Sequence, residues 1–174
     1  MDTGGLNTGL ASQTGLIEQK LRAEQIVKAG AGWFLAIAGL SIVNSIMTMV
    51  GAGFHFIFGL GVTEIVDAIG AHTGTAGSAL GLIVNLFVAG VFVLFWYFAK
   101  QGRRWAFWVG MILYLIDGLI LLTFKDWLGT AFHAYALFRI YHGMQGIPVL
   151  ENLRRMTVAP IAPSAPSSAP ITPA

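Results

Sequence analysis

Among the polar and charged residues inside otherwise apolar stretches of the sequence, five have types that could support chemistry. They are Asn44, Asn85, Asp117, His133 and Arg139. A carboxyl group and an imidazole at one level can share a proton or a hydrogen bond. Carboxamides beside them could add hydrogen bonds to a small molecule. These residues are therefore the candidate interior polar site.

The elements that must position these residues are long uncharged segments. A bilayer core of ~30 Å needs about 20 apolar residues per helix, and the sequence predicts four such spans, at about 32–52, 78–99, 105–124 and 127–146. At ~1.5 Å per residue, the first four polar residues fall roughly 3 to 6 Å to the outer side of the midplane. One polar group per helix at one depth predicts a shared site.

Asp117 is the residue that most needs a partner. An ionised carboxylate near the bilayer centre costs about 2.5 to 3.5 kcal/mol on insertion scales, so Asp117 is expected to be protonated, paired or solvated. In an antiparallel hairpin that turns near Lys125, His133 comes level with Asp117. Arg139 lies under two turns further inward and is the second candidate. It shares a helical face with His142, so one helix is not expected to direct both His133 and Arg139 at one carboxylate.

The same residues also have structural explanations. The stripes that contain the two asparagines have near-helical spacing and small side chains: Ser41, Asn44, Ser45 and Thr48, and Ser78, Gly81, Asn85 and Ala89. Such stripes mostly serve as contacts between helices, and we favour that role for both asparagines. A buried structural pair is favoured over a ligand or proton site for Asp117. For Arg139 and His142 we favour side chains that extend to the inner interface.

Cofactor and catalytic chemistry have little support in the sequence. Two imidazoles could ligate haem iron, and His55 and His133 are the conceivable pair, but only the fourth span contains a histidine. We expect no cofactor and no metal site. Cysteine is absent, which removes disulfides and thiolate chemistry. No nucleophile elbow, zincin helix or phosphate loop is found, so we assign no catalytic residue and predict that the protein is not an enzyme.

Composition and charge indicate a membrane protein. The 174 residues are 56% hydrophobic and 10% charged, against about 25% charged in soluble domains. The net charge of +2 and the position of basic residues beside apolar runs argue against nucleic acid as a partner. Eight lysines and arginines flank one side of the predicted spans: Lys20, Arg22, Lys28, Lys100, Arg103, Arg104, Arg154 and Arg155. Only Lys125 lies on the other side, so both termini are expected in the cytoplasm.

The predicted fold class is an all-α membrane protein, a four-transmembrane-helix bundle with an outer interfacial helix and disordered tails. Residues 1–15 are rich in Gly, Thr, Asn and Ser and are predicted to be a disordered N-terminal tail. Residues 16–28 are predicted to form a cytoplasmic surface helix, and residues 62–70 a short helix on the outer surface. The transmembrane domain covers 29–147, and 157–174 form a Pro/Ala/Ser-rich disordered tail.

Part of the sequence resembles a known group of proteins. The residues Ala-Phe-His-Ala-Tyr-Ala-Leu-Phe-Arg-Ile-Tyr-His-Gly, which end at Gly143, are preceded by the pair Asp117–Gly118. With segments 29–44 and 59–69 they resemble small uncharacterised polytopic proteins of bacterial inner membranes. The resemblance covers most of residues 29–147. It implies an integral protein of the bacterial inner membrane and no particular reaction.

Two classes of function remain after these exclusions. The favoured one is a non-enzymatic integral membrane protein, a small accessory or scaffold subunit of a membrane assembly. Its partners would be the lipid bilayer and a second membrane protein or further copies of the chain. The alternative is a small-molecule, proton or cofactor-binding, transport-like module that uses the interior polar residues.

Overall fold

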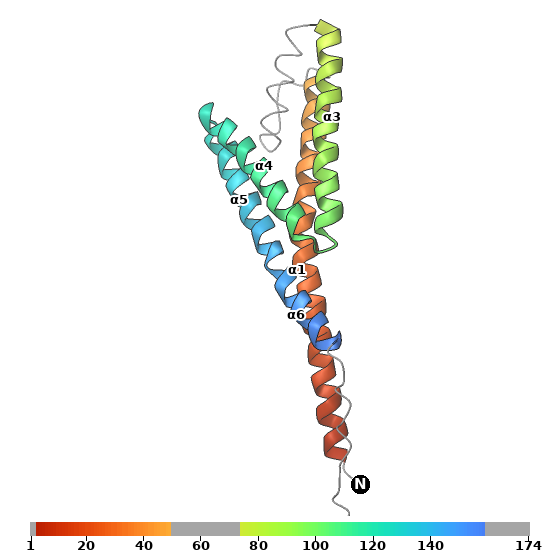
Figure 1. Ribbon diagram of the computed structural model, residues 1–174. Coiled ribbons are helices and arrows are strands. Elements are labelled where there is room, and N and C mark those ends of the chain that lie inside the picture. The colour runs from red at the N-terminus through yellow and green to blue at the C-terminus, as the bar shows by residue number, and fades with distance from the viewer. Residues whose placement is uncertain (1–2, 50–73, 159–174) are drawn as a thin grey trace, which may run out of the picture.

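The regular structure of the described residues is entirely α-helical. The computed structural model describes residues 3–49 and 74–158. Its helices are α1 (Thr3–Met49), α3 (Gly74–Ala99), α4 (Arg104–Thr123), α5 (Trp127–Met144) and α6 (Gly146–Val158). Helix α1 is the longest, and α3 and α6 pack beside different parts of it, while α4 and α5 form a hairpin (Figure 1). The predicted all-α fold is confirmed for these residues.

Three helical segments of the described chain are long and apolar enough to cross a membrane. They are Gln13–Met47, Gly81–Ala99 and Arg104–Thr123. The predicted spans 78–99 and 105–124 agree with α3 and α4 to within a few residues. Helix α5 occupies the predicted fourth span, 127–146, but two histidines and an arginine lower its hydropathy, and it is not among the three. A fourth crossing stays a prediction.

Helix α1 differs from the prediction at its N-terminal end. It is one helix of 47 residues, where the sequence predicted a disordered segment, a separate surface helix and then a span that begins near Gly32. No proline interrupts this part of the chain, and each glycine costs only about 1 kcal/mol relative to alanine. Helix extension is cooperative, so the long apolar segment and the residues before it form a single element.

Several predictions lie outside the described residues. The outer interfacial helix at 62–70, the last residues of the first predicted span and most of the C-terminal tail fall within 50–73 and 159–174. His55 lies there too. The structure gives no description of these segments.

Aromatic packing joins α1, α3 and α4. The ring of Phe34 on α1 lies 6.3 Å from that of Phe92, 5.9 Å from that of Phe95 and 6.0 Å from that of Phe107. Gly110 of α4 makes room for this cluster, because a Cβ added there would stand 2.5 Å from the Phe34 ring. Helices α1, α3 and α4 are thereby packed around one buried side chain.

Helix α6 was not predicted as a separate element. Gly146 and Pro148 end α5 as expected, but the chain then turns directly into a further helix, with Pro148 in its first turn. Proline is accepted there because the first amides of a helix have no partner within the helix. Ile147 is buried, and Arg104 forms an ion pair with Glu151 at 2.7 Å. Helix α6 therefore packs back onto the bundle.

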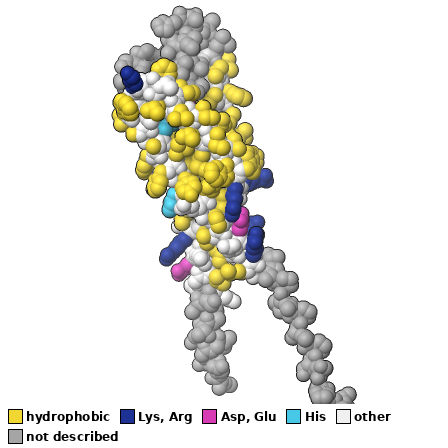
Figure 2. All heavy atoms as spheres, turned by 60° about the vertical axis from the view of Figure 1, so that its left-hand side comes forward, with side chains coloured by type: hydrophobic (Ala, Val, Ile, Leu, Met, Phe, Trp, Pro, Cys, Tyr) yellow, Lys and Arg dark blue, Asp and Glu magenta, His cyan; other side chains and the backbone are white. Residues whose placement is uncertain are grey.

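The outer surface is divided between apolar and charged side chains. Figure 2 shows apolar side chains over most of the described upper part of one face, and charged side chains gathered mainly towards the lower end. Many large apolar side chains of α3 and α4 are exposed, with Phe87 and Trp108 among them. The two helices thus present apolar surface outward as well as inward.

Candidate functional site

The turn between α4 and α5 sets the level of the candidate residues. Lys125 adopts a left-handed conformation with φ of 61°, which reverses the chain direction. Asp126 then caps α5, because its Oδ1 accepts a hydrogen bond from the Gly129 amide at 3.0 Å. This compact turn makes the two helices antiparallel. It places Asp117 opposite His133, the partner that the hairpin register predicted.

Asp117 and His133 form a buried pair. The distance between Nε2 of His133 and Oδ2 of Asp117 is 2.9 Å, and the side chains are 2% and 5% exposed, respectively. The other ring nitrogen, Nδ1, lies 2.8 Å from the carbonyl oxygen of Gly129. A carbonyl oxygen only accepts hydrogen bonds, so Nδ1 must carry a proton.

This tautomer determines the chemistry of the pair. The bond between Nε2 and Oδ2 needs one proton, which can lie on the imidazole or on the carboxyl group. In the first case the pair is an imidazolium with a carboxylate, and in the second both groups are neutral. The net charge of the pair is zero in both cases. A shared proton of this kind means that no uncompensated charge is buried among the apolar helices.

Two neighbours on α4 shape the site. The ring of Tyr114 stacks on the imidazole of His133, with 4.2 Å between centroids and 17° between planes. Gly118 allows α5 to approach, because a Cβ at this position would lie 2.9 Å from Cβ of His133. The hydroxyl group of Tyr114 is buried and has no hydrogen-bond partner within the described part of the chain. The sequence pattern did not indicate Tyr114 or Gly118 as site residues, although they stand three residues before and one residue after Asp117.

A second polar contact joins α1 and α3. Nδ2 of Asn85 donates a hydrogen bond to Oγ of Ser45 at 2.7 Å, and both residues are buried. Asn44 and Ser41 are buried on the same side of α1. Ser41 also donates to the carbonyl oxygen of Ile37, one turn earlier, at 3.0 Å. Ser41, Asn44 and Ser45 of α1 therefore face the bundle interior, and Ser45 contacts α3.

Arg139 lies apart from these contacts. It is exposed on α5 and lines a cavity against α1, together with Arg22 and His142. It is six residues beyond His133, or about 9 Å along the helix. The structure thus pairs Asp117 with His133, and it pairs Asn85 with Ser45, the residue that follows Asn44. Arg139 instead lines the cavity between α1 and α5.

Haem ligation by His133 does not fit this geometry. Both ring nitrogens of His133 are engaged in hydrogen bonds, and a metal ligand needs one free nitrogen. Within residues 13–47 and 81–156 there is no group of three or more His, Cys, Asp or Glu residues that could hold a metal ion.

The fold and the site define a class by physical properties alone: a helical protein whose long apolar helices enclose hydrogen-bonded polar groups. No protein-family model, curated protein or solved structure matches the chain.

Proposed function

We propose that this chain is a non-enzymatic, multi-pass integral membrane protein that serves as a small accessory or scaffold subunit of a membrane assembly. In this proposal α1, α3, α4 and α5 cross the bacterial inner membrane, and both termini lie in the cytoplasm. The observation that carries the proposal is that the interior polar groups are hydrogen bonded to each other between helices. Asn85 with Ser45, and Asp117 with His133, each link two helices within the bundle.

The surface supports the membrane part of the proposal. Apolar side chains exposed over α3 and α4 would be unfavourable in water, whereas they match lipid tails. Three basic residues lie at the turn between α3 and α4, namely Lys100, Arg103 and Arg104. The turn between α4 and α5 has a single basic residue, Lys125. This asymmetry is the usual signature of cytoplasmic and external sides.

The burial of the Asp117–His133 pair supports a structural role over a catalytic one. Both side chains are almost fully enclosed, and the α1–α5 cavity is lined by other residues. A group that binds substrate needs access from solvent or from a cavity. A sealed pair fixes the register of two helices instead, because sliding either helix by one turn would leave a buried charge or hydrogen-bond donor unpaired.

Native mass spectrometry of the full chain, extracted gently from its own membrane, tests the scaffold role. We expect the chain to appear with a protein partner, or with further copies of itself, at a fixed stoichiometry. A sample extracted with a harsher detergent is the control, since the assembly should dissociate there while the chain keeps its mass. A monomer with a bound metabolite would reject the scaffold role.

A second candidate function, a proton or small-molecule module, is favoured by one observation. The pair holds a single transferable proton, and the buried hydroxyl of Tyr114 lies on the helix turn before Asp117 with no hydrogen-bond partner in the described chain. The variant Asp117→Asn separates the two functions. A structural role predicts a lower melting temperature in detergent. A proton module predicts an unchanged melting temperature and the loss of proton uptake in reconstituted vesicles.

A further inference from the structure

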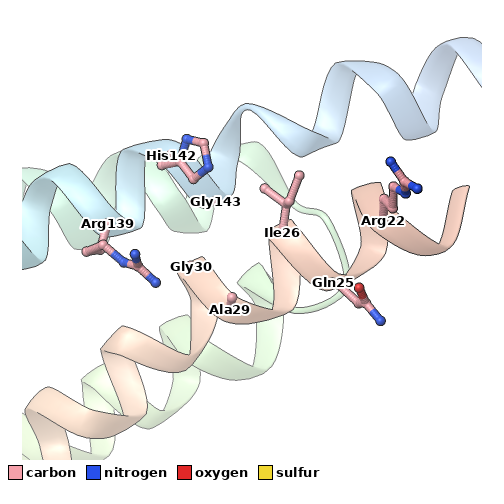
Figure 3. Close-up of a pocket in the computed structure, with 8 residues that line it drawn as sticks. All are labelled: Arg22, Gln25, Ile26, Ala29, Gly30, Arg139, His142 and Gly143. Carbon is pink, nitrogen blue, oxygen red and sulfur yellow. The ribbon is translucent and has the colours of Figure 1, made fainter. Parts of the chain in front are cut away.

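A cavity of about 410 Å³ lies between α1 and α5, away from the polar pairs. It is lined by Arg22, Gln25, Ile26, Ala29, Gly30, Arg139, His142 and Gly143 (Figure 3). The two helices approach most closely at Gly30 and Gly143, where a Cβ on either glycine would overlap the backbone of the other. On both sides of this glycine contact the side chains are longer, and they hold α1 and α5 apart around the cavity.

The lining of the cavity is basic. Arg22 comes from α1, and Arg139 and His142 come from α5, whereas no acidic residue lines the cavity. In Figure 3 the guanidinium group of Arg139 extends from α5 towards α1. Arg22 and Arg139 lie at opposite ends of the cavity, on the two sides of the Gly30–Gly143 contact (Figure 3). Each guanidinium group provides donors suited to phosphate oxygens.

Neither arginine is neutralised by the rest of the described chain. Within residues 13–47 and 81–156, Arg22 and Arg139 form no ion pair, and the nearby Glu24 is paired with Lys28 at 3.7 Å. Glu18, one turn before Arg22, is exposed and does not come within ion-pair distance of it. The cavity therefore keeps a local positive charge that an anion would compensate.

An aromatic cluster lies directly beside the basic one. Trp33 follows Ala29 by one helical turn, and its ring lies 5.4 Å from that of Tyr135 and 6.2 Å from that of Phe132. Tyr135 itself is one turn from Arg139 on α5. The side chains at the contact between α1 and α5 therefore change from basic to aromatic along the direction that leads into the proposed membrane. This order matches a molecule with an anionic head and an apolar tail.

We propose that this cavity binds the phosphate headgroup of an anionic phospholipid, with its acyl chains along Trp33 and Tyr135. Basic pockets between membrane helices on the cytoplasmic side bind such headgroups, and Arg22 lies in the segment expected on that side. The inference depends on the proposed membrane location but not on the scaffold role, because lipid binding needs no protein partner.

The test uses the full chain in a neutral detergent, titrated with phosphatidylglycerol or phosphatidylcholine and followed by native mass spectrometry. We expect phosphatidylglycerol to bind more tightly than phosphatidylcholine. The double variant Arg22→Gln with Arg139→Gln should lose affinity for phosphatidylglycerol by about tenfold or more. The matched control is Arg154→Gln with Arg155→Gln, which removes the same charge from the exposed face of α6 and should bind as the wild type does.

A second variant keeps both arginines and fills the cavity. Ala29→Trp should weaken phosphatidylglycerol binding without a change in net charge, because Ala29 lines the cavity. Equal binding by the wild type, the double variant and Ala29→Trp would overturn the site, and so would equal binding of the two lipids. Displacement of phosphatidylglycerol by millimolar inorganic phosphate would show that the cavity takes free phosphate and would reject a lipid ligand.

Discussion

Two regions of α5 carry polar residues under opposite conditions. His133 is buried, and both of its ring nitrogens are hydrogen bonded, to Gly129 and to Asp117. Arg139, less than two turns further along, is exposed and unpaired within the described chain. The face of the helix, rather than the residue type, therefore decides whether a polar group is hydrogen bonded within the bundle or is available to a ligand.

Glycines produce both environments by different means. Gly118 lets α5 approach α4 closely enough for an imidazole to reach a carboxylate. Gly30 and Gly143 also bring two helices together, but the neighbouring side chains there are long and diverge around a cavity. Close packing thus joins polar groups in the first case and leaves room between them in the second.

The largest effect is expected for His133→Leu, which breaks the buried pair on one side. It leaves the carboxyl group of Asp117 without its imidazole partner, and such a loss costs about 3 to 5 kcal/mol. Reversible unfolding in mixed detergent micelles would measure it. His142→Leu removes an exposed histidine from the same helix and should change stability by less than about 0.5 kcal/mol. Equal losses for the two variants would show that burial does not distinguish the two regions.

A smaller effect is expected for Gly143→Ala, which tests the close contact of α1 and α5. The added methyl group would overlap the backbone at Gly30, and overpacking of this kind costs about 1 to 3 kcal/mol. Gly39→Ala is the control, because a Cβ there has open space and should stabilise the helix by up to about 1 kcal/mol. The same unfolding assay reports both. A stabilising effect of both variants would contradict the contact.

The hydrogen bond between α1 and α3 is expected to contribute less than the ionisable pair. Ser45→Ala removes the acceptor of Asn85, and hydrogen bonds between membrane helices contribute about 0.6 kcal/mol on average, with a maximum near 1.7. The control Thr123→Val removes a hydroxyl group that donates a hydrogen bond to the carbonyl oxygen of Ile120 in its own helix. We expect Ser45→Ala to lower the unfolding free energy by more than this control does. The reverse order would argue against the interhelical bond.

The smallest effect is expected at the exposed ion pair of α4 and α6. Arg104 and Glu151 are 2.7 Å apart, but their side chains are 50% and 47% exposed. Exposed pairs contribute between zero and about 1 kcal/mol, and salt screens them. Glu151→Gln should therefore lower stability by less than about 1 kcal/mol at low salt and by less still in 1 M salt. A salt-independent loss above 2 kcal/mol would show that this pair behaves as a buried one.

Local sequence patterns predicted the parts of the structure that depend on neighbours in the chain. Clustered charges marked the ends of α3 and α4, and the short turn at Lys125 fixed which residue of α5 stands opposite Asp117. A hairpin with a short connection has few possible registers. The level of His133 could therefore be predicted from residue counting alone.

The remaining features depend on contacts between distant segments. The continuity of α1 could not be predicted, because its N-terminal residues are rich in glycine and polar side chains. The cavity at Arg22 and Arg139 depends on the crossing of α1 and α5 at one pair of glycines. Single glycines are common in apolar helices, and nothing local distinguishes the two that touch.

A double-mutant cycle on Asp117 and His133 tests most directly whether the interior polar groups act by binding each other. The unfolding free energies of the wild type, Asp117→Leu, His133→Leu and the double variant would be measured in the same micelles. We expect the double variant to be less destabilised than the sum of the single variants by more than about 0.6 kcal/mol. Additive effects, within about 0.3 to 0.5 kcal/mol, would show that the two residues act independently and would reject the structural pair.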